Sequence, residues 1–118
     1  MTKTDAKSGY FPCDSAQCLD GCLDSTEGGL SKLGARVVEE CDRVGILLDG
    51  THTGKRSTLE MIDKSAKPII FSHSNPSALA PNLRNIDDEQ ITACTGRGGV
   101  VCLAPWGPLV MRPNTTHQ

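Results

Sequence analysis

The sequence is poor in aromatic side chains and has no cluster of basic ones. Its aromatic residues are Tyr10, Phe11, Phe71 and Trp106, too few for the stacking surface on which proteins bind single-stranded nucleic acid. Twelve Lys and Arg residues against 14 Asp and Glu leave a formal net charge of −2, and no run of the sequence is basic. Because phosphate contacts require clustered positive charge, these absences argue against a nucleic-acid partner.

Long hydrophobic stretches are also missing. Hydrophobic residues make up 37% of the 118 residues, and no apolar run approaches the roughly 20 residues that span a bilayer. Residues 1–20 lack the apolar segment that a secretory signal carries. We therefore expect a cytoplasmic chain with no membrane contact, long enough for one small domain with a hydrophobic core.

Cysteine is abundant and falls into two groups. Cys13, Cys18 and Cys22 cluster near the N-terminus with four and three intervening residues, a poor match to the C-x₂-C pairs of zinc sites. We expect these three to be free thiols in a loop, because a reducing compartment keeps cysteines unpaired. The other three lie within apolar patterns and are predicted to be core residues. They are Cys41, Cys94 and Cys102.

The remaining sequence alternates helical and extended patterns. Residues 1–29 show no sustained period and are interpreted as an irregular leader. Helices are predicted at 31–44, 57–66 and 87–98, and short apolar strands at 46–49, 68–74 and 100–104. The strands are rich in Ile, Leu and Val and do not alternate with polar residues, which is typical of strands buried on both faces of a parallel sheet. The order indicates an α/β fold of about three consecutive αβ units.

Local signals define the ends of these helices. Ser31 is the expected N-cap of the first helix and Gly45 its left-handed C-cap. Ser57 and Glu60 have the spacing of a capping box for the second helix. The third helix begins with acidic residues, which suit the positive end of its dipole. The first helix should bury one face, made of Leu33, Val37, Cys41 and Val44.

The turn "DGTHTGKRS" after the first predicted strand has some features of a phosphate-binding loop. That loop requires four residues between its glycines, then Lys followed by Ser or Thr. Here Gly50 and Gly54 are separated by three residues, and Lys55 is followed by Arg56. The turn is therefore not a phosphate loop of that type.

Two histidines follow consecutive predicted strands. His52 comes just after the first strand and His73 lies at the carboxyl end of the second. Chemistry in α/β sheets and barrels is found at that edge, and parallel strands lie about 4.8 Å apart. The histidines could therefore share one metal ion, and imidazole suits zinc. On spacing alone, two unrelated surface or capping histidines are the favoured interpretation, because two ligands do not make a zinc site.

Longer motifs help to decide between a shared metal site and two unrelated histidines. The segment "LSKLGARVVEECDRVGILLDGTHTGKRSTLEMIDKSAKPIIFSHSNPSAL", followed by "NLRNIDDEQITACTGRGGVV", resembles the membrane (renal) dipeptidase family of zinc metallopeptidases. The resemblance runs from Asp20 to Pro108, and its most specific parts are "DGTHTG", "FSHSNP", "RN" and "RGGVV" in this order and spacing. It implies a partial (β/α)₈ TIM-type barrel over 30–108, after the leader 1–29 and before an irregular tail 109–118.

The resemblance also implies a function and residue roles. Family members hydrolyse dipeptides at a binuclear zinc site. By resemblance, His52 and His73 ligate one of the two zinc ions and Arg84 binds the carboxylate of the dipeptide substrate. Asp49 is expected to support the ligands from outside the metal's coordination shell or to be structural. No residue of this chain is assigned a direct catalytic role.

Several parts of the family site are missing from the sequence. The chain has no H-x-D motif, and its glutamates fall in predicted loops or helices. The sequence therefore resembles an internal part of a dipeptidase, expected to bind zinc weakly and to be inactive on its own. A non-catalytic α/β binding or interaction module is the alternative. Open sheet edges also predict self-association or a homo-oligomer.

Overall fold

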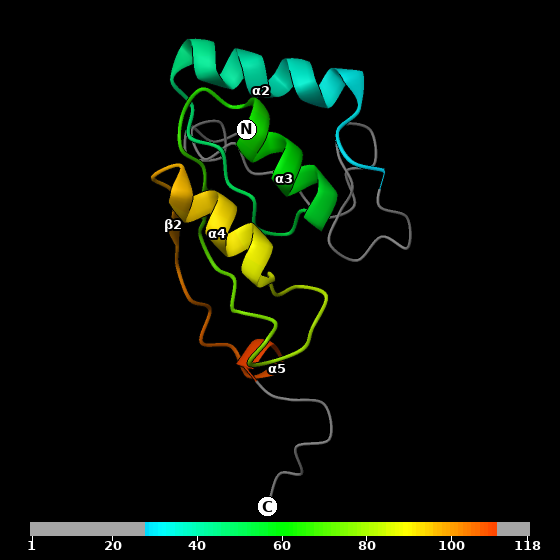
Figure 1. The fold of residues 1–118 in the computed structure, drawn as a ribbon, viewed down its shortest axis with the longest axis vertical. Helices are drawn as coiled ribbons and strands as arrows, with labels where there is room; N and C mark the ends of the chain where they lie inside the picture. Colours follow the sequence, from blue (N-terminus) through cyan, green and yellow to red (C-terminus); the bar gives the residue numbers. More distant parts are fainter. Residues whose placement is uncertain (1–27, 111–118) are drawn as a thin grey trace, which may run out of the picture.

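A computed structural model describes residues 28–110 (Figure 1). The predictions for residues 1–27, which include the N-terminal cysteines, and for residues 111–118 lie outside this part. The elements follow in the order α2, α3, β1, α4, β2 and α5. Their bounds are α2 Lys32–Val44, α3 Lys55–Lys64, β1 Ile70–Phe71, α4 Asp88–Gly96, β2 Val100–Val101 and α5 Gly107–Val110. The short helix α5 crosses the predicted boundary between residues 108 and 109.

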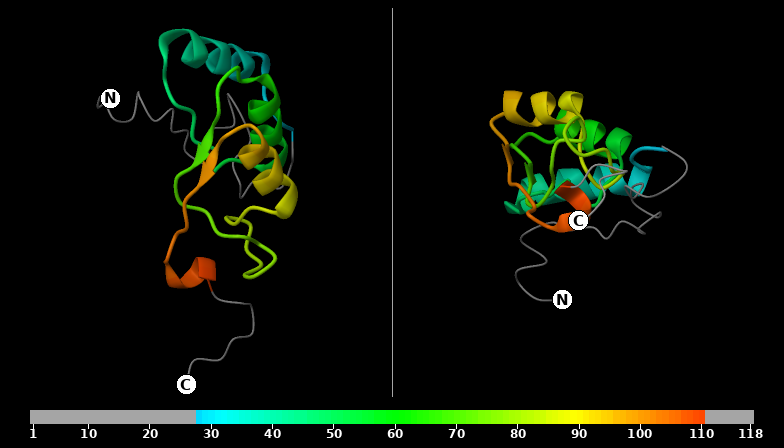
Figure 2. Two further views of the ribbon diagram at one scale, coloured as in Figure 1. Left: turned by 60° about the vertical axis from the view of Figure 1, so that its left-hand side comes forward. Right: turned by 90° about the horizontal axis from the view of Figure 1, so that it is seen from below.

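The strands form a small parallel sheet. β1 and β2 pair in parallel with Ile70 opposite Val100 and Phe71 opposite Val101. Helices α3 and α4 lie side by side against the strand pair (Figure 2). The predicted α/β class with parallel strands is therefore confirmed. No described helix has the length and apolar character that crossing a membrane requires.

The first predicted strand is much shorter than expected. Of residues 46–49, only Asp49 forms a β-bridge, a parallel one to Ile70. The Ile70 N–H donates to the Leu48 carbonyl over 3.0 Å, and the Gly50 N–H donates to the Ile70 carbonyl over 2.8 Å. Ile46 cannot join the sheet in this way because its N–H donates to Cys41 O at the end of α2. Three parallel segments thus meet in the order 48–50, β1, β2.

The ends of α2 are those predicted, but its buried face is rotated. The Ser31 hydroxyl accepts a hydrogen bond from the Gly34 N–H over 3.0 Å, and Gly45 has φ 79°. The predicted face was wrong at Leu33 and Val44, which are 54% and 48% exposed. The buried positions are instead Gly34, Val38 and Cys41, spaced by four and three residues. The period of the apolar residues therefore predicted the spacing of the buried positions, but the buried face is turned toward Gly34 and Val38 and away from Leu33 and Val44.

Helix α3 begins earlier than predicted. Gly54 is its N-cap, and the Thr58 N–H donates to the Gly54 carbonyl over 2.9 Å. The predicted capping box was therefore wrong, since Ser57 is buried inside the helix. The Glu60 carboxylate instead accepts a hydrogen bond from the Leu30 N–H over 2.7 Å.

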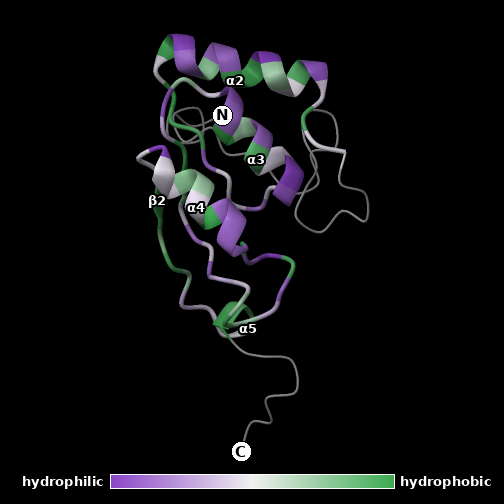
Figure 3. Cartoon of the chain, viewed as in Figure 1, coloured by the Kyte–Doolittle hydropathy of each residue, from purple (hydrophilic) through white to green (hydrophobic). Residues whose placement is uncertain are grey.

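The hydrophobic core lies between the strands and the helices. It includes Phe71, Leu48, Met61 and Cys94, each at most 2% exposed. The prediction that Cys102 is a core residue was wrong, because its side chain is exposed. Cys102 belongs to the apolar stretch 100–103, which begins with β2 (Figure 3). One side of this stretch is uncovered, and Val100 and Leu103 are 55% and 68% exposed. No segment between residues 28 and 110 covers that side.

Helix α4 has a complete capping box. The Asp87 carboxylate accepts from the Gln90 N–H over 2.9 Å, and the Gln90 side chain accepts from the Asp87 N–H over 3.0 Å. Lys55 Nζ of α3 also lies 2.6 Å from Asp87 Oδ2. Burial raises the pKa of Asp87, but the Lys55 ammonium and the Gln90 N–H outweigh it and hold that pKa below its usual range.

Replacing Asp87 with alanine is expected to lower the free energy of unfolding by about 1–2 kcal/mol, because the N-cap is lost. Asp87→Asn keeps a capping oxygen and should lose about 0.5 kcal/mol or less. Since the folded-state pKa lies below the unfolded one, the ionic contribution is present at neutral pH and disappears as the pH falls through the folded-state value. Urea unfolding at pH 7 measures the free energy of unfolding of both variants. Equal losses would show that the ion pair, and not the cap, carries the effect.

Candidate metal and substrate site

Two histidine rings meet at the carboxyl edge of the parallel segments. His52 follows the Asp49 bridge and His73 follows β1. Their Nε2 atoms are 3.2 Å apart, their ring centroids 5.1 Å apart, and their planes are inclined by 63°. The structure thus brings together the two histidines that the sequence placed at this edge.

The backbone holds His52 in an unusual conformation. His52 has φ 66°, the only positive φ of a non-glycine residue among residues 28–110. The turn before it is fixed because the Thr51 N–H donates to Asp49 Oδ1 over 2.9 Å and the Thr53 N–H donates to Gly50 O over 3.2 Å. A left-handed residue costs conformational energy and is found where the surrounding structure imposes it, often at functional sites. Here it directs the imidazole of His52 to His73.

Asp49 organises the base of the site. Its side chain is 3% exposed. Oδ1 accepts hydrogen bonds from the N–H groups of Thr51 and Ser72, over 2.9 and 3.2 Å, and Oδ2 accepts from the Ser72 hydroxyl. Ser72 Oγ is in turn 2.7 Å from His73 Nδ1. Asp49 therefore reaches His73 through Ser72, a residue with no distinctive pattern in the sequence.

The environment favours neutral imidazole at His52. Burial lowers the pKa of His52, and the positive charge of Arg84 and the neighbouring His73 lower it further, against the opposing charge of Asp49. A neutral ring is the form that binds metal.

Arg84 lies in the loop between β1 and α4, close to the histidines. Its Nη2 donates to the His73 carbonyl over 3.3 Å. Nη1 is buried and has no hydrogen-bond partner among the described residues. A buried guanidinium nitrogen with unused donors is costly unless a ligand or water satisfies it. The guanidinium is thus held through Nη2, while Nη1 keeps a donor that no described group satisfies.

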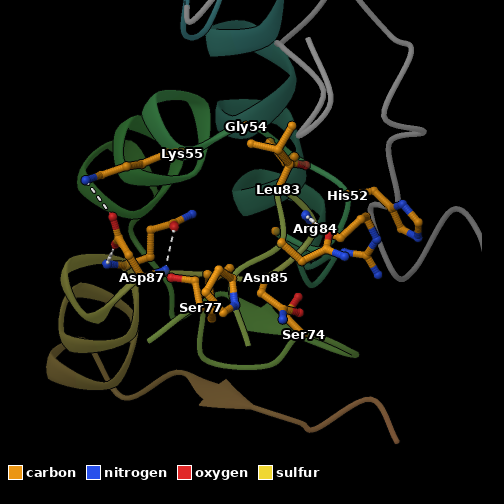
Figure 4. A pocket seen from close by; sticks show the side chains of 15 residues that line it. His52, Gly54, Lys55, Ser74, Ser77, Leu83, Arg84, Asn85 and Asp87 are labelled. Atoms are coloured by element: carbon orange, nitrogen blue, oxygen red, sulfur yellow. Dashed lines mark hydrogen bonds and ion pairs between the residues drawn. The ribbon is translucent and has the colours of Figure 1, made fainter. Parts of the chain in front are cut away.

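A cavity of about 550 Å³ opens beside Arg84 (Figure 4). His52, Arg84 and Ser74 line one side, and Lys55 and Asp87 line the other. The cavity is therefore bordered by the histidine site at one end and by an ion pair at the other. Its size falls within the range of small-molecule sites, about 300–1,000 Å³.

Two asparagines fix the loop that carries Arg84. The Asn75 N–H donates to Asn85 Oδ1 over 3.3 Å, and Asn85 Nδ2 donates to Leu109 O over 2.7 Å. Asn75 Nδ2 also donates to Ala104 O over 2.7 Å. Both asparagines are buried, and they tie the Arg84 loop to the segment after β2. The motifs "SNP" and "RN" contain these residues, but nothing in their spacing shows that they bond to each other.

The histidine pair fits part of a zinc site. Two nitrogens bound to one tetrahedral zinc at about 2.0–2.1 Å are separated by about 3.3 Å, close to the observed 3.2 Å. Within residues 28–110, however, no group of three or more His, Cys, Asp or Glu side chains could hold a metal ion. The described residues thus offer two ligands, which is half of a tetrahedral coordination shell.

The fold and the site define a class of protein, namely α/β proteins that gather polar ligands at the carboxyl ends of parallel strands. The family is shown by comparison with known sequences. The family model for membrane dipeptidase, peptidase family M19, matches residues 11–116. The chain belongs to this family.

Named relatives agree with the family. The chain is 34% identical to dipeptidase tcpJ of Claviceps purpurea over 80 residues, which is 66% of this chain and 19% of that protein. It is 34% identical to dipeptidase 3 of Rattus norvegicus over 73 residues, 62% of this chain and 15% of that protein. The chain therefore spans less than a fifth of the length of these relatives.

Solved structures of a probable dipeptidase and a metallopeptidase also match this chain. The probable dipeptidase PvdM of Pseudomonas aeruginosa matches 88% of this chain with a TM-score of 0.78 at 26% identity, and the match covers 28% of that chain. A metallopeptidase of Rhodobacter sphaeroides, solved with a phosphinate mimic of the dipeptide L-Ala-D-Ala, matches 66% of this chain with a TM-score of 0.64 at 35% identity, covering 22% of that chain.

Proposed function

We propose that this chain carries two ligands of one zinc ion, His52 and His73, and the substrate-binding arginine of a zinc dipeptidase site. These residues would lie within part of a (β/α)₈ barrel. The observation that carries this proposal is the 3.2 Å separation of the Nε2 atoms of His52 and His73. That distance suits two ligands of one zinc ion, and the rings lie at the strand edge where barrel enzymes place their chemistry.

Arg84 is proposed to bind the terminal carboxylate of a dipeptide. A guanidinium is a planar fork that meets a carboxylate with two hydrogen bonds. Its contact with the His73 carbonyl orients it, Arg84 lines the cavity, and its Nη1 is a donor that no described group satisfies. A carboxylate bound to Arg84 would lie next to the histidine pair. The bound dipeptide mimic of the Rhodobacter enzyme makes a dipeptide the substrate class to test first.

Bound zinc would polarise the peptide carbonyl and lower the pKa of a bound water. The chain's own residues contribute ligation by His52 and His73 and orientation by Arg84. Because the described residues supply only two ligands, we propose that this chain alone does not turn over substrate, and that other barrel segments provide the remaining ligands. Binding without turnover is the alternative that the cavity beside Arg84 supports.

Calorimetry tests the proposed binding role. In zinc-containing buffer, the phosphinate mimic of L-Ala-D-Ala should bind the wild-type protein, and Arg84→Gln should weaken that binding at least about tenfold, since a bidentate charged contact is lost. Arg43→Gln is the matched control, because Arg43 is exposed on α2 and pairs with Glu40. Equal affinity in wild type and Arg84→Gln would refute the role of Arg84.

A dipeptide panel tests the proposed lack of turnover. Hydrolysis by the zinc-treated protein should not exceed that of buffer containing zinc. Hydrolysis that disappears in His73→Ala would show that the chain assembles a complete site, contrary to this proposal.

A further inference from the structure

Ser72 links Asp49 to His73. Its hydroxyl donates to Asp49 Oδ2 and lies 2.7 Å from Nδ1 of His73. A third neighbour, Thr51 Oγ1, is farther away at 3.4 Å. One hydroxyl oxygen thus stands between a buried carboxylate and a histidine that faces the proposed metal position.

Counting hydrogens fixes the direction of these bonds. A serine hydroxyl has one hydrogen to donate, and an ionised carboxylate has none. The short contact between Ser72 and Asp49 must therefore use the hydrogen of Ser72. The threonine hydroxyl cannot compete for it, because a bond to a charged acceptor is stronger than a neutral one at 3.4 Å.

The other contact of Ser72 then needs a hydrogen from the imidazole. Since the hydroxyl hydrogen is directed at Asp49, the 2.7 Å contact requires an N–H at Nδ1 of His73. In a neutral imidazole the second nitrogen is then unprotonated and carries a lone pair. That nitrogen is Nε2, which lies 3.2 Å from Nε2 of His52.

We propose that Ser72 is a positioning residue that holds His73 in the Nδ1–H tautomer, so that its Nε2 lone pair is presented to a metal ion. This inference rests on the proposed metal site. The hydrogen bond made by one ring nitrogen sets the state of the other, and groups that bond a metal-binding histidine from outside the coordination shell tune its affinity. Asp49 acts through Ser72, because it accepts the hydroxyl hydrogen and two backbone N–H groups.

The first experiment reads the tautomer directly and needs no metal. In metal-free protein with ¹⁵N-labelled histidine, long-range ¹H–¹⁵N correlation at a pH where the rings are neutral distinguishes protonated from unprotonated ring nitrogens. His73 should be protonated at Nδ1 in the wild type. Finding Nε2–H in the wild type would overturn the proposal.

The isosteric variant Asp49→Asn makes a sharper prediction. The amide oxygen can keep the two backbone N–H bonds, while the amide nitrogen donates to Ser72. The hydroxyl of Ser72 should then donate to Nδ1 of His73, 2.7 Å away, in preference to Thr51 Oγ1 at 3.4 Å, which moves the ring hydrogen to Nε2. The tautomer of His73 should therefore reverse, while the thermal midpoint shows whether the fold is kept. An unchanged tautomer in folded Asp49→Asn would overturn the relay.

Zinc titration tests the consequence for binding. Ser72→Ala should weaken zinc binding about 10- to 100-fold, the effect expected from losing such a supporting partner, and Ser72→Thr should restore most of it because the hydroxyl remains. Thr95→Ala is the control, since within residues 28–110 the Thr95 hydroxyl donates to carbonyls of α4. Equal zinc affinity in Ser72→Ala and the wild type would overturn the positioning role.

Together, the tautomer measurements and the zinc titration also separate this inference from the proposed function. If His73 shows the Nδ1–H tautomer and Asp49→Asn reverses it, the relay stands. Failure of the wild type to bind zinc would then refute the metal site and, with it, the positioning role of Ser72.

Discussion

Replacing His73 with alanine should lower the affinity of this protein for zinc by more than about 100-fold. The described residues offer two imidazole ligands 3.2 Å apart, so the variant removes half of the ligand set and leaves one imidazole. This loss should exceed the 10- to 100-fold effect of removing a partner that only supports a ligand. His52→Ala should have a similar effect, since the two rings are proposed to bind the same ion.

Competition with a chromophoric zinc chelator measures this affinity. The protein should be fully reduced, and the comparison should be made in a background in which Cys13, Cys18, Cys22 and the exposed Cys102 are serine, so that accessible thiols do not compete. His117→Ala is the control for removing a histidine that the proposal does not use. If His73→Ala and His117→Ala bind zinc as well as the parent protein, the histidine pair is not the site.

Replacing Gly99 with alanine should destabilise the fold more than most substitutions. A Cβ at this position would lie 2.2 Å from Ile69 O, 2.6 Å from Cys94 Sγ and 2.8 Å from Cys94 O. Two of these atoms are backbone oxygens, and Gly99 lies between the end of α4 and the start of β2, so little can move without separating the sheet from the helix. We expect a loss of about 3 kcal/mol or more, at the upper end of overpacking effects.

Gly96 provides a matched control for this substitution. It is the last residue of α4, and a Cβ there would meet nothing within 4 Å. Gly96→Ala should therefore leave stability unchanged or raise it by up to about 1 kcal/mol, since alanine favours helix. Urea unfolding of the two variants measures the difference. Similar stabilities would contradict the close contact between Gly99 and Ile69.

The parts of the fold that local chemistry determines were predictable. Ser31 and Gly45 end α2 as expected because a capping hydroxyl and a left-handed glycine act within a few residues. The buried face of α2 was not predictable in detail, because Leu33 and Val44 are as apolar as the buried Val38. Which apolar residues become buried depends on where α3 and the sheet lie, and that is not a local property.

The start of α3 shows a second limit of local reasoning. Ser57 and Glu60 had the spacing of a capping box, yet Gly54 begins the helix and Glu60 bonds the distant Leu30 N–H. A tertiary contact with a residue thirty positions away therefore replaced the local one.

The residues of the candidate site also fall into those that the sequence could identify and those that it could not. His52, His73 and Arg84 could be selected by residue type, position and resemblance. The structure brings the three together, and His52 and Arg84 line the cavity. Asp49 was selected as a supporting residue, but its partner Ser72 was not. A serine beside a histidine has no distinctive pattern, and its role becomes visible only when the distances to Asp49 and His73 are known.

X-ray absorption at the zinc edge of the zinc-loaded protein would identify the atoms that bind the metal. We expect scattering from two imidazole rings with nitrogen at about 2.0 Å, light-atom ligands in the remaining positions, and the loss of one imidazole contribution in His73→Ala. Sulfur at about 2.3 Å, or an unchanged spectrum in His73→Ala, would show that the metal binds elsewhere and would contradict the histidine-pair site.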